Sequence, residues 1–369
     1  MKRTTIFLAA LALVAASCTK TEVVSDKTQD SVKGIGFSAY TSRPTKAAQE
    51  DVTTAKLSSF QVTAIGNNAL YFNNVNFAKN AETSFWESNP VYFWPAYKLS
   101  FYAYNTPAED NGRFTCDINA AKQHLKYSPS TDLSKQEDLV AASALDQSEP
   151  TGATQLNFNH YLTQIIVKAK NSNGSYTVQV DSVKIANFAG EGTYDFTNMT
   201  ATTEQVNTDE SIDYRSGFST TKTLSATETV MMNDTGKGRW YLVPQSATPW
   251  VKGTDNNTAN GTYVGLKVRI TSPSSVAIYP ATGEGTAWMA IPVSESAYTF
   301  EQGKKYSIIL DFFSSTGKGA GYVDPEEPGD LDGDGNANND KGKAIVGGAI
   351  KFNATVDEWP TETVIKIEL

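Results

Sequence analysis

The residues best suited to carry chemistry lie in one acidic loop near the C-terminal end of the chain. In the sequence DLDGDGN, residues 330–336, oxygen-bearing side chains stand at every second position and a glycine follows the third of them. An EF-hand calcium loop begins in the same way, with ligands at positions 1, 3 and 5 and glycine at 6. Position 12 here is Lys341 rather than a bidentate glutamate, and no helical pattern flanks the loop. Two interpretations stay open: a solvated acidic loop, or calcium held by Asp330, Asp332, Asp334 and Asn336.

Catalytic patterns are otherwise missing from the sequence. The two histidines, His124 and His160, lack the spacing of metal ligands, and the chain has no HExxH, GxSxG or P-loop motif. A catalytic pair of carboxylates can be far apart in sequence, so a motif search does not reach it. We predict that both histidines are structural or exposed and that the protein is not an enzyme.

Aromatic residues are dense in two short stretches, Phe85-Trp86 and Tyr92–Tyr97. Exposed rings can stack on sugars, and a glycan-binding interpretation assigns that role to Trp86 and Trp250. Buried aromatic rings dominate the cores of small β-sandwiches, however. We therefore expect these rings to pack in the core.

The first 18 residues, MKRTTIFLAALALVAASC, have the form of an export signal. Two basic residues precede an apolar run from Ile6 to Ala16, and small residues stand directly before Cys18. The run is shorter than the ~20 apolar residues that span a bilayer. We interpret residues 1–17 as a lipoprotein signal peptide and Cys18 as the residue that is acylated, with palmitate for example, on an outer-membrane precursor. Simple cleavage near Ser17 is the alternative. The polar residues 18–33 predict a flexible tether.

Composition limits the partners and the number of domains. The 369-residue chain has a formal net charge of −9 and no basic cluster, which argues against binding of nucleic acid or anionic lipid head groups. Apolar residues make up 40% of the chain, enough for a buried core. Cys116 is the only other cysteine, so we predict no disulfide framework.

Between the ends of the chain, short apolar stretches with period-2 alternation are separated by Asn, Gly and Pro. They predict an all-β protein of two tandem antiparallel β-sandwich domains, residues 34–150 and 151–369, with a turn-rich boundary near 146–154. Short helices are expected only near residues 117–124 and 137–145. The Gly/Asp/Asn-rich loop 314–348 is long enough to be functional or disordered.

The first and last strands of the folded part share one pattern. Ile35, Phe37 and Ala39 alternate with small or polar residues in the strand 34–40. At the C-terminus, in residues 364–369, an equivalent apolar face is formed by Ile365, Ile367 and Leu369. We hypothesise that the first strand is a displaceable placeholder in a sheet, and that the last strand of another copy replaces it. The alternative is that the last strand completes its own sheet.

Basic residues follow the first strand at once and offer a protease an exposed cleavage site. Arg43 is followed by Pro44, which hinders trypsin-like enzymes, whereas Lys46 precedes Ala47 without that obstruction. Cleavage after Arg43 or Lys46 would remove the first strand with everything that precedes it.

Several stretches taken together resemble the fimbrillin family of lipoprotein pilins, the subunits of type V pili. They include the Cys18 start, IGFSAY at 35–40, VYFWPAYKLSFYAY at 91–104, DLVAA at 138–142, LNFNHYLTQIIVKA at 156–169, WYLVPQ at 240–245, GKKYSIILDF at 303–312 and AIKFNATVDEW at 349–359. The resemblance covers almost the whole chain through the order and spacing of these stretches.

The resemblance implies two transthyretin-like β-sandwich domains and export as a lipidated precursor. In shaft subunits of the family, a trypsin-like protease removes the lipidated segment with the first strand, and another subunit's C-terminal strand fills the groove. The implied function is adhesion by a cell-surface fimbrium built of this protein and other fimbrial subunits. A subunit that kept its lipid would be an anchor or accessory protein.

Overall fold

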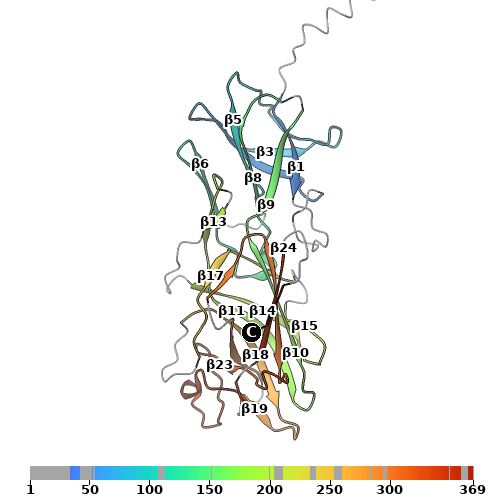
Figure 1. Ribbon diagram of the computed structural model, residues 1–369, viewed down its shortest axis with the longest axis vertical. Helices are drawn as coiled ribbons and strands as arrows, with labels where there is room; N and C mark the ends of the chain where they lie inside the picture. The colour runs from blue at the N-terminus through green and yellow to red at the C-terminus, as the bar shows by residue number, and fades with distance from the viewer. Residues whose placement is uncertain are drawn as a thin grey trace, which may run out of the picture.

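The computed structural model describes residues 34–41, 52, 55–106, 113–150, 152–198, 200–202, 211–232, 238–252, 260–282, 285–293, 297–348, 350–358 and 365–368. These residues form an elongated all-β molecule with an upper and a lower lobe (Figure 1). The all-β prediction is confirmed. Along the ranges given above, no helix combines the length and the apolar character that crossing a bilayer needs.

The upper lobe is a barrel of seven strands that closes on itself in the order β1-β4-β3-β2-β5-β8-β9. Alternation builds it: in β5, Leu99, Phe101 and Ala103 are all fully buried. One pair of neighbours, β1 and β9, is parallel, and the other pairs are antiparallel. The strands are β1 (Gly36–Thr41), β2 (Ser59–Gly66), β3 (Ala69–Lys79), β4 (Trp86–Ser88), β5 (Leu99–Tyr104), β8 (Val140–Gln147) and β9 (Thr154–His160).

A small sheet at the waist joins the two halves of the chain. Its strand order is β13-β12-β7-β6, so β7 of one hairpin pairs with β12 of the other. The first hairpin consists of β6 (Phe114–Asn119) and β7 (Lys122–Tyr127), and the second of β12 (Gly192–Asp195) and β13 (Thr200–Thr202). The waist core contains mostly aromatic side chains, among them Tyr104, Tyr127, Tyr161, Tyr194, Phe196 and Tyr241. The prediction of short helices near residues 117–124 and 137–145 is wrong, because these segments contribute to the strands β6, β7 and β8 (Val140–Gln147).

The lower lobe is a β-sandwich with its core between two six-stranded sheets. One sheet has the order β15-β10-β22-β24-β25, with β16 paired to β10, and the other has the order β14-β11-β18-β20-β23, with β19 paired to β18. The first sheet contains β15 (Thr229–Val230), β10 (Thr163–Asn171), β16 (Trp240–Leu242), β22 (Lys304–Phe312), β24 (Lys351–Glu358) and β25 (Ile365–Glu368). The second contains β14 (Ser211–Thr223), β11 (Thr177–Ala189), β18 (Tyr263–Thr271), β19 (Ala277–Tyr279), β20 (Ala287–Pro292) and β23 (Tyr322–Val323).

Strand pairing bears on where one domain would end. β9 begins after residue 150, yet it pairs with β8 and β1 inside the upper barrel. The chain enters the lower sandwich with β10, which starts at Thr163. The division at residue 150 remains a proposal, and this pairing favours a boundary near 161. β17 (Gln245–Ala247) and β21 (Tyr298–Phe300) form a further two-stranded sheet.

Candidate functional site: the first strand and its slot

β1 fills a slot between two strands that do not pair with each other. It runs parallel to β9, with Phe37 opposite Thr154 and Thr41 opposite Phe158. On its other side it is antiparallel to β4, where Phe37 pairs with Trp86. Because the barrel closes only through β1, removing this strand would leave β9 and β4 with unpaired backbone groups.

The inward face of β1 is part of the barrel core. Ile35, Phe37 and Ala39 are 2%, 0% and 3% exposed, while Tyr40 is 53% exposed. The Phe37 ring lies edge-on to the rings of Phe77 and Phe101, at centroid distances of 4.8 and 5.1 Å. Burial of an Ile or Phe side chain contributes about 1.5–3 kcal/mol each, so these three side chains hold β1 with roughly 5 kcal/mol before backbone hydrogen bonds.

Residues 89–97, which we call the strap, cross the start of β1. The Ile35 N–H donates to the Tyr92 carbonyl at 2.7 Å, and Gly34 forms an isolated bridge with Phe93. A Cβ at Gly34 would lie 2.6 Å from Cγ1 of Val91, so any other residue at this position would require the Val91 side chain to move. The strap is itself fastened to the barrel, since the Tyr71 hydroxyl donates to the Phe93 carbonyl at 2.6 Å.

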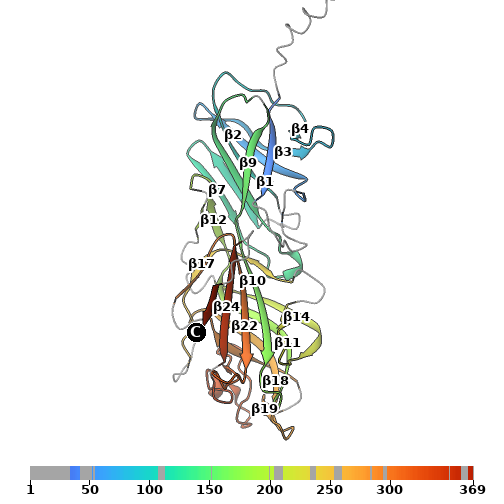
Figure 2. The same ribbon diagram turned by 45° about the vertical axis from the view of Figure 1, so that its right-hand side comes forward.

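The C-terminal strand β25 pairs antiparallel with β24 at the edge of the lower sandwich (Figure 2). Ile365 stands opposite Val356 and Ile367 opposite Ala354. Within this single chain, the last strand therefore completes its own sheet. Only β24 pairs with it in the part of the chain that the structure describes, so no second strand holds it in place. Leu369 lies outside the described residues.

The predicted lipidation and processing sites also fall outside the described ranges. Cys18 precedes residue 34, and Arg43 and Lys46 lie between β1 and Val52. The Val52 N–H donates to Oδ2 of Asp138 at 2.8 Å. His160 lies against the same carboxylate, with its Nδ1 3.0 Å from Oδ2, and both side chains are fully buried. His160 is therefore structural, with a carboxylate partner that sequence reasoning did not provide.

The acidic loop brings together a different set from the one that its spacing predicted. Carboxylate oxygens of Asp330, Asp332 and Asp340 lie within 4.8 Å of one another, and Asp334 is outside this group. Asp334 and Asn336 are both exposed. Asp340 is 1% exposed, accepts the Leu331 N–H at 2.7 Å and pairs with Lys343 Nζ at 2.7 Å. The loop thus has a third carboxylate one position before Lys341, together with an ammonium group that neutralises it.

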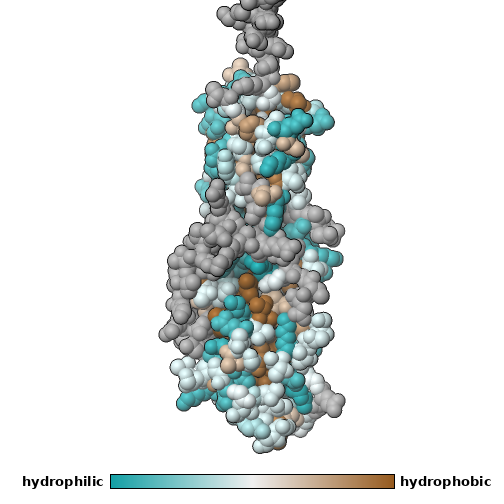
Figure 3. All heavy atoms as spheres, turned by 90° about the vertical axis from the view of Figure 1, so that its right-hand side faces the viewer, coloured by the Kyte–Doolittle hydropathy of each residue, from teal (hydrophilic) through white to brown (hydrophobic). Residues whose placement is uncertain are grey.

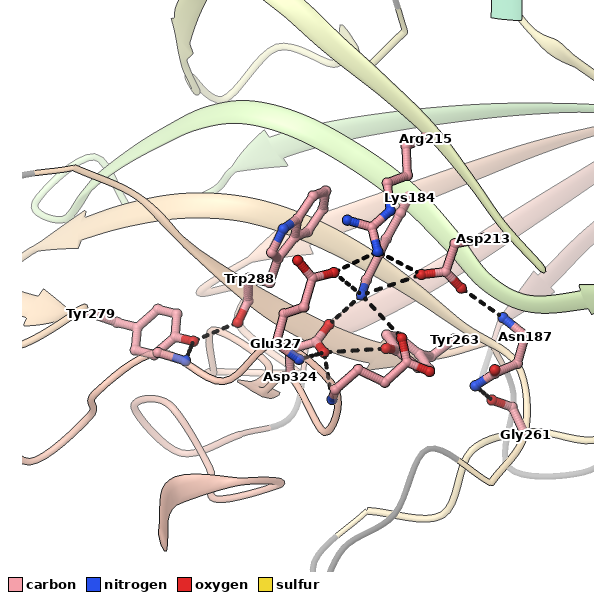
Figure 4. Close-up of polar contacts among 12 residues, drawn as sticks. Lys184, Asn187, Asp213, Arg215, Gly261, Tyr263, Tyr279, Trp288, Asp324 and Glu327 are labelled. Atoms are coloured by element: carbon pink, nitrogen blue, oxygen red, sulfur yellow. Dashed lines mark hydrogen bonds and ion pairs between the residues drawn. The ribbon is translucent and has the colours of Figure 1, made fainter. Parts of the chain in front are cut away.

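A buried lysine fastens the long loop 314–348 to the second sheet of the lower lobe. Lys184 on β11 is fully buried, with its Nζ 3.1 Å from Asp324 and 3.4 Å from Glu327 (Figure 4). Glu326 and Asp213 lie 3.6 and 3.7 Å from the same nitrogen. Burial, together with the negative charge of Asp213, raises the pKa of Glu326. We assign this cluster a structural role, because its charges join the loop to the sheet.

The two tryptophans to which the glycan-binding interpretation assigns sugar stacking are core residues. Trp86 and Trp250 are 3% and 2% exposed, and the indole N–H of Trp86 donates to the Leu57 carbonyl at 3.0 Å. Neither ring can stack on a sugar without unfolding of its surroundings. The core-packing prediction is confirmed for these two rings, whereas Phe85, Phe93 and Tyr97 are exposed.

Comparison with known proteins identifies similar sequences and folds. The profile of the family described as fimbrillin-like matches residues 24–318. A fimbrial protein from Bacteroides vulgatus is similar in structure, with a TM-score of 0.54 and 17% identity over 88% of this chain and 99% of its own. The fimbrial anchor protein Mfa2 from Porphyromonas gingivalis aligns with a TM-score of 0.32 and 10% identity over 76% of this chain and 91% of its own. No curated protein sequence matches.

Proposed function

Because the chain belongs to the fimbrillin-like family and is a fimbrial subunit, we propose a mechanism for its assembly. The subunit polymerises by exchange of its β1 for the C-terminal strand of another copy. The precursor is a lipoprotein acylated at Cys18 in the outer membrane. Cleavage after Arg43 or Lys46 frees β1, and the processed subunit joins a cell-surface fimbrium that serves adhesion.

The burial of β1 in a closed barrel is the observation that carries this proposal. Ile35, Phe37 and Ala39 leave an apolar slot when β1 departs, and β9 and β4 then offer backbone donors and acceptors on both sides. Ile365, Ile367 and Leu369 have the same alternation and carry enough apolar surface to fill that slot. Since β25 is an edge strand held by β24 alone among the described strands, it can leave its sheet at less cost than β1.

Limited trypsin treatment of the purified precursor tests the proposal. We expect SDS-resistant ladders after cleavage and N-terminal sequences that begin at Pro44 or Ala47. Deletion of residues 364–369 removes the donor strand but leaves the slot, so it should abolish the ladders. Ladders that survive this deletion would exclude the C-terminal strand as the donor.

A second candidate function is that of an anchor or accessory subunit that keeps its lipid. Pro44 favours it, because a proline after Arg43 slows cleavage at that bond. In that case surface-assembled material has an N-terminus blocked at Cys18. The Lys46→Gln variant distinguishes the two: loss of processing assigns the cut to Lys46, and unchanged assembly without any cut favours the anchor.

A further inference from the structure

An apolar surface lies at the free end of the upper lobe, where the N-terminal segment joins the barrel. We call it the apical patch and define it by Leu70, Val91, Phe93 and Tyr97, which are 46%, 54%, 46% and 38% exposed. Figure 3 shows apolar side chains interspersed with hydrophilic ones at this end of the molecule. Three of these four side chains belong to the nine-residue strap, and exposed apolar side chains that cluster mark interaction surfaces.

The barrel holds the apical patch in a fixed shape. Tyr71 connects its parts: its ring contacts the Tyr97 ring edge-on at 6.4 Å, and its hydroxyl donates to the Phe93 carbonyl. Beneath the strap, Tyr92 packs on Phe72 and Trp94 packs on Phe101, with ring centroids 4.7 and 5.5 Å apart. The inward rings anchor the strap, so its outward side chains keep fixed positions on the surface.

The course of the chain indicates what covers this surface. Gly34, the first described residue, lies against Val91 and Phe93 of the patch. On the proposed function, the 16 residues from Cys18 to Lys33 connect this point to an acyl group in the membrane, a span of at most about 55 Å. The patch is therefore at the end of the molecule that a lipid-anchored precursor turns toward the bilayer.

We propose that the apical patch rests in the interface of a zwitterionic lipid bilayer while the precursor is anchored there. Aromatic and aliphatic side chains enter the head-group region, and Tyr rings are favoured at that depth. Lys98, which follows Tyr97 and is exposed, can keep its ammonium group in water above them. Because the strap accepts a hydrogen bond from the Ile35 N–H, loss of β1 removes one of the contacts that hold the strap. Processing also separates the patch from the acylated segment, so it weakens this attachment to the membrane.

A site-specific fluorescence experiment on the acylated full-length protein tests this inference. In a Cys116→Ser background, Val91→Cys and Val276→Cys are labelled with the fluorophore NBD, and the protein is placed in phosphatidylcholine–phosphatidylethanolamine vesicles. Val276 is a matched control because it is a valine, 62% exposed, in the turn before β19 at the opposite end of the molecule. Intact mass confirms acylation, and equal melting temperatures confirm that both variants fold.

We expect a blue shift and quenching by nitroxide-labelled lipids at position 91 only, both lost after trypsin releases the body. NBD emission typical of an aqueous environment at both positions overturns the inference. An intact mass that shows no acyl chain on the protein also overturns it. A shift at position 91 that appears without vesicles and grows with protein concentration assigns the patch to contact between copies instead. None of these results depends on SDS-resistant ladders, so failure here is distinct from failure of strand exchange.

Discussion

Truncation of Phe37 should weaken the upper barrel more than any other change in β1. Its fully buried ring meets three neighbours, Phe60, Phe77 and Phe101, from different strands. Replacement of a core Phe by Ala costs about 3–5 kcal/mol through lost burial and a residual cavity. Since the three rings belong to β2, β3 and β5, they cannot close the gap without distorting the barrel. We therefore expect Phe37→Ala to cost about 4 kcal/mol.

Urea unfolding of the unacylated chain measures this cost, with Tyr40→Ala as the control on the same strand. Tyr40 is 53% exposed, so its loss should change the unfolding free energy by no more than about 0.5 kcal/mol. Hydrogen exchange should show faster exchange in Phe37→Ala for the amides of β1, β9 and β4, with the lower lobe unchanged. If Phe37→Ala and Tyr40→Ala have equal costs, β1 does not fill a core slot and the reasoning fails.

Three further predictions concern the lower lobe. Lys184→Met should destabilise the protein by about 3–5 kcal/mol, because it leaves buried Asp324 without its ion-pair partner. The control Lys168→Met breaks a surface ion pair and should cost about 0–1 kcal/mol. Equal melting temperatures for these two variants would contradict the prediction. The raised pKa of Glu326 means that the folded state binds its proton more tightly, so this residue's contribution to stability is greatest at low pH and is lost as pH rises through the folded-state pKa. Glu326→Gln should therefore stabilise the protein at pH 7 and lose that advantage toward pH 4, and thermal unfolding across pH that shows the reverse trend would refute it. Lys343→Ala should strengthen any calcium binding by the acidic loop, because it removes the ammonium group beside Asp340. If calorimetric titration with calcium gives no heat for either the unaltered protein or the variant, the loop has no calcium site.

Strands with a clear apolar face could be predicted from the sequence almost to the residue. The apolar stretches 99–104 and 287–292 coincide with β5 and β20, and both strands have runs of consecutive buried residues. The sequence of β14, SIDYRSGFSTTKT, is polar and does not predict a strand. Its pairing with the long strand β11, rather than its own hydrophobicity, makes it a strand.

Contacts between distant segments had no local signal. The parallel pairing of β1 with β9 joins residues more than a hundred positions apart, and nothing in either strand specifies the partner. Lys184 lies in an ordinary strand sequence, and its carboxylate partners come from β14 and the loop 314–348. The role of Asp340 was hidden for a similar reason, because the EF-hand pattern directs attention to position 12 and the chain places the carboxylate one residue earlier.

A disulfide between two different copies tests strand exchange most directly. Gln155 is exposed on β9 and stands opposite Ser38, so a cysteine there borders the slot that β1 leaves. One preparation carries Gln155→Cys and the other carries Lys366→Cys or Glu368→Cys. Both have Cys116→Ser and start from the precursor acylated at Cys18, so that only a bond between copies can form. The account predicts mixed disulfides after trypsin processing and none before it. Processed, ladder-forming protein without these disulfides would contradict it.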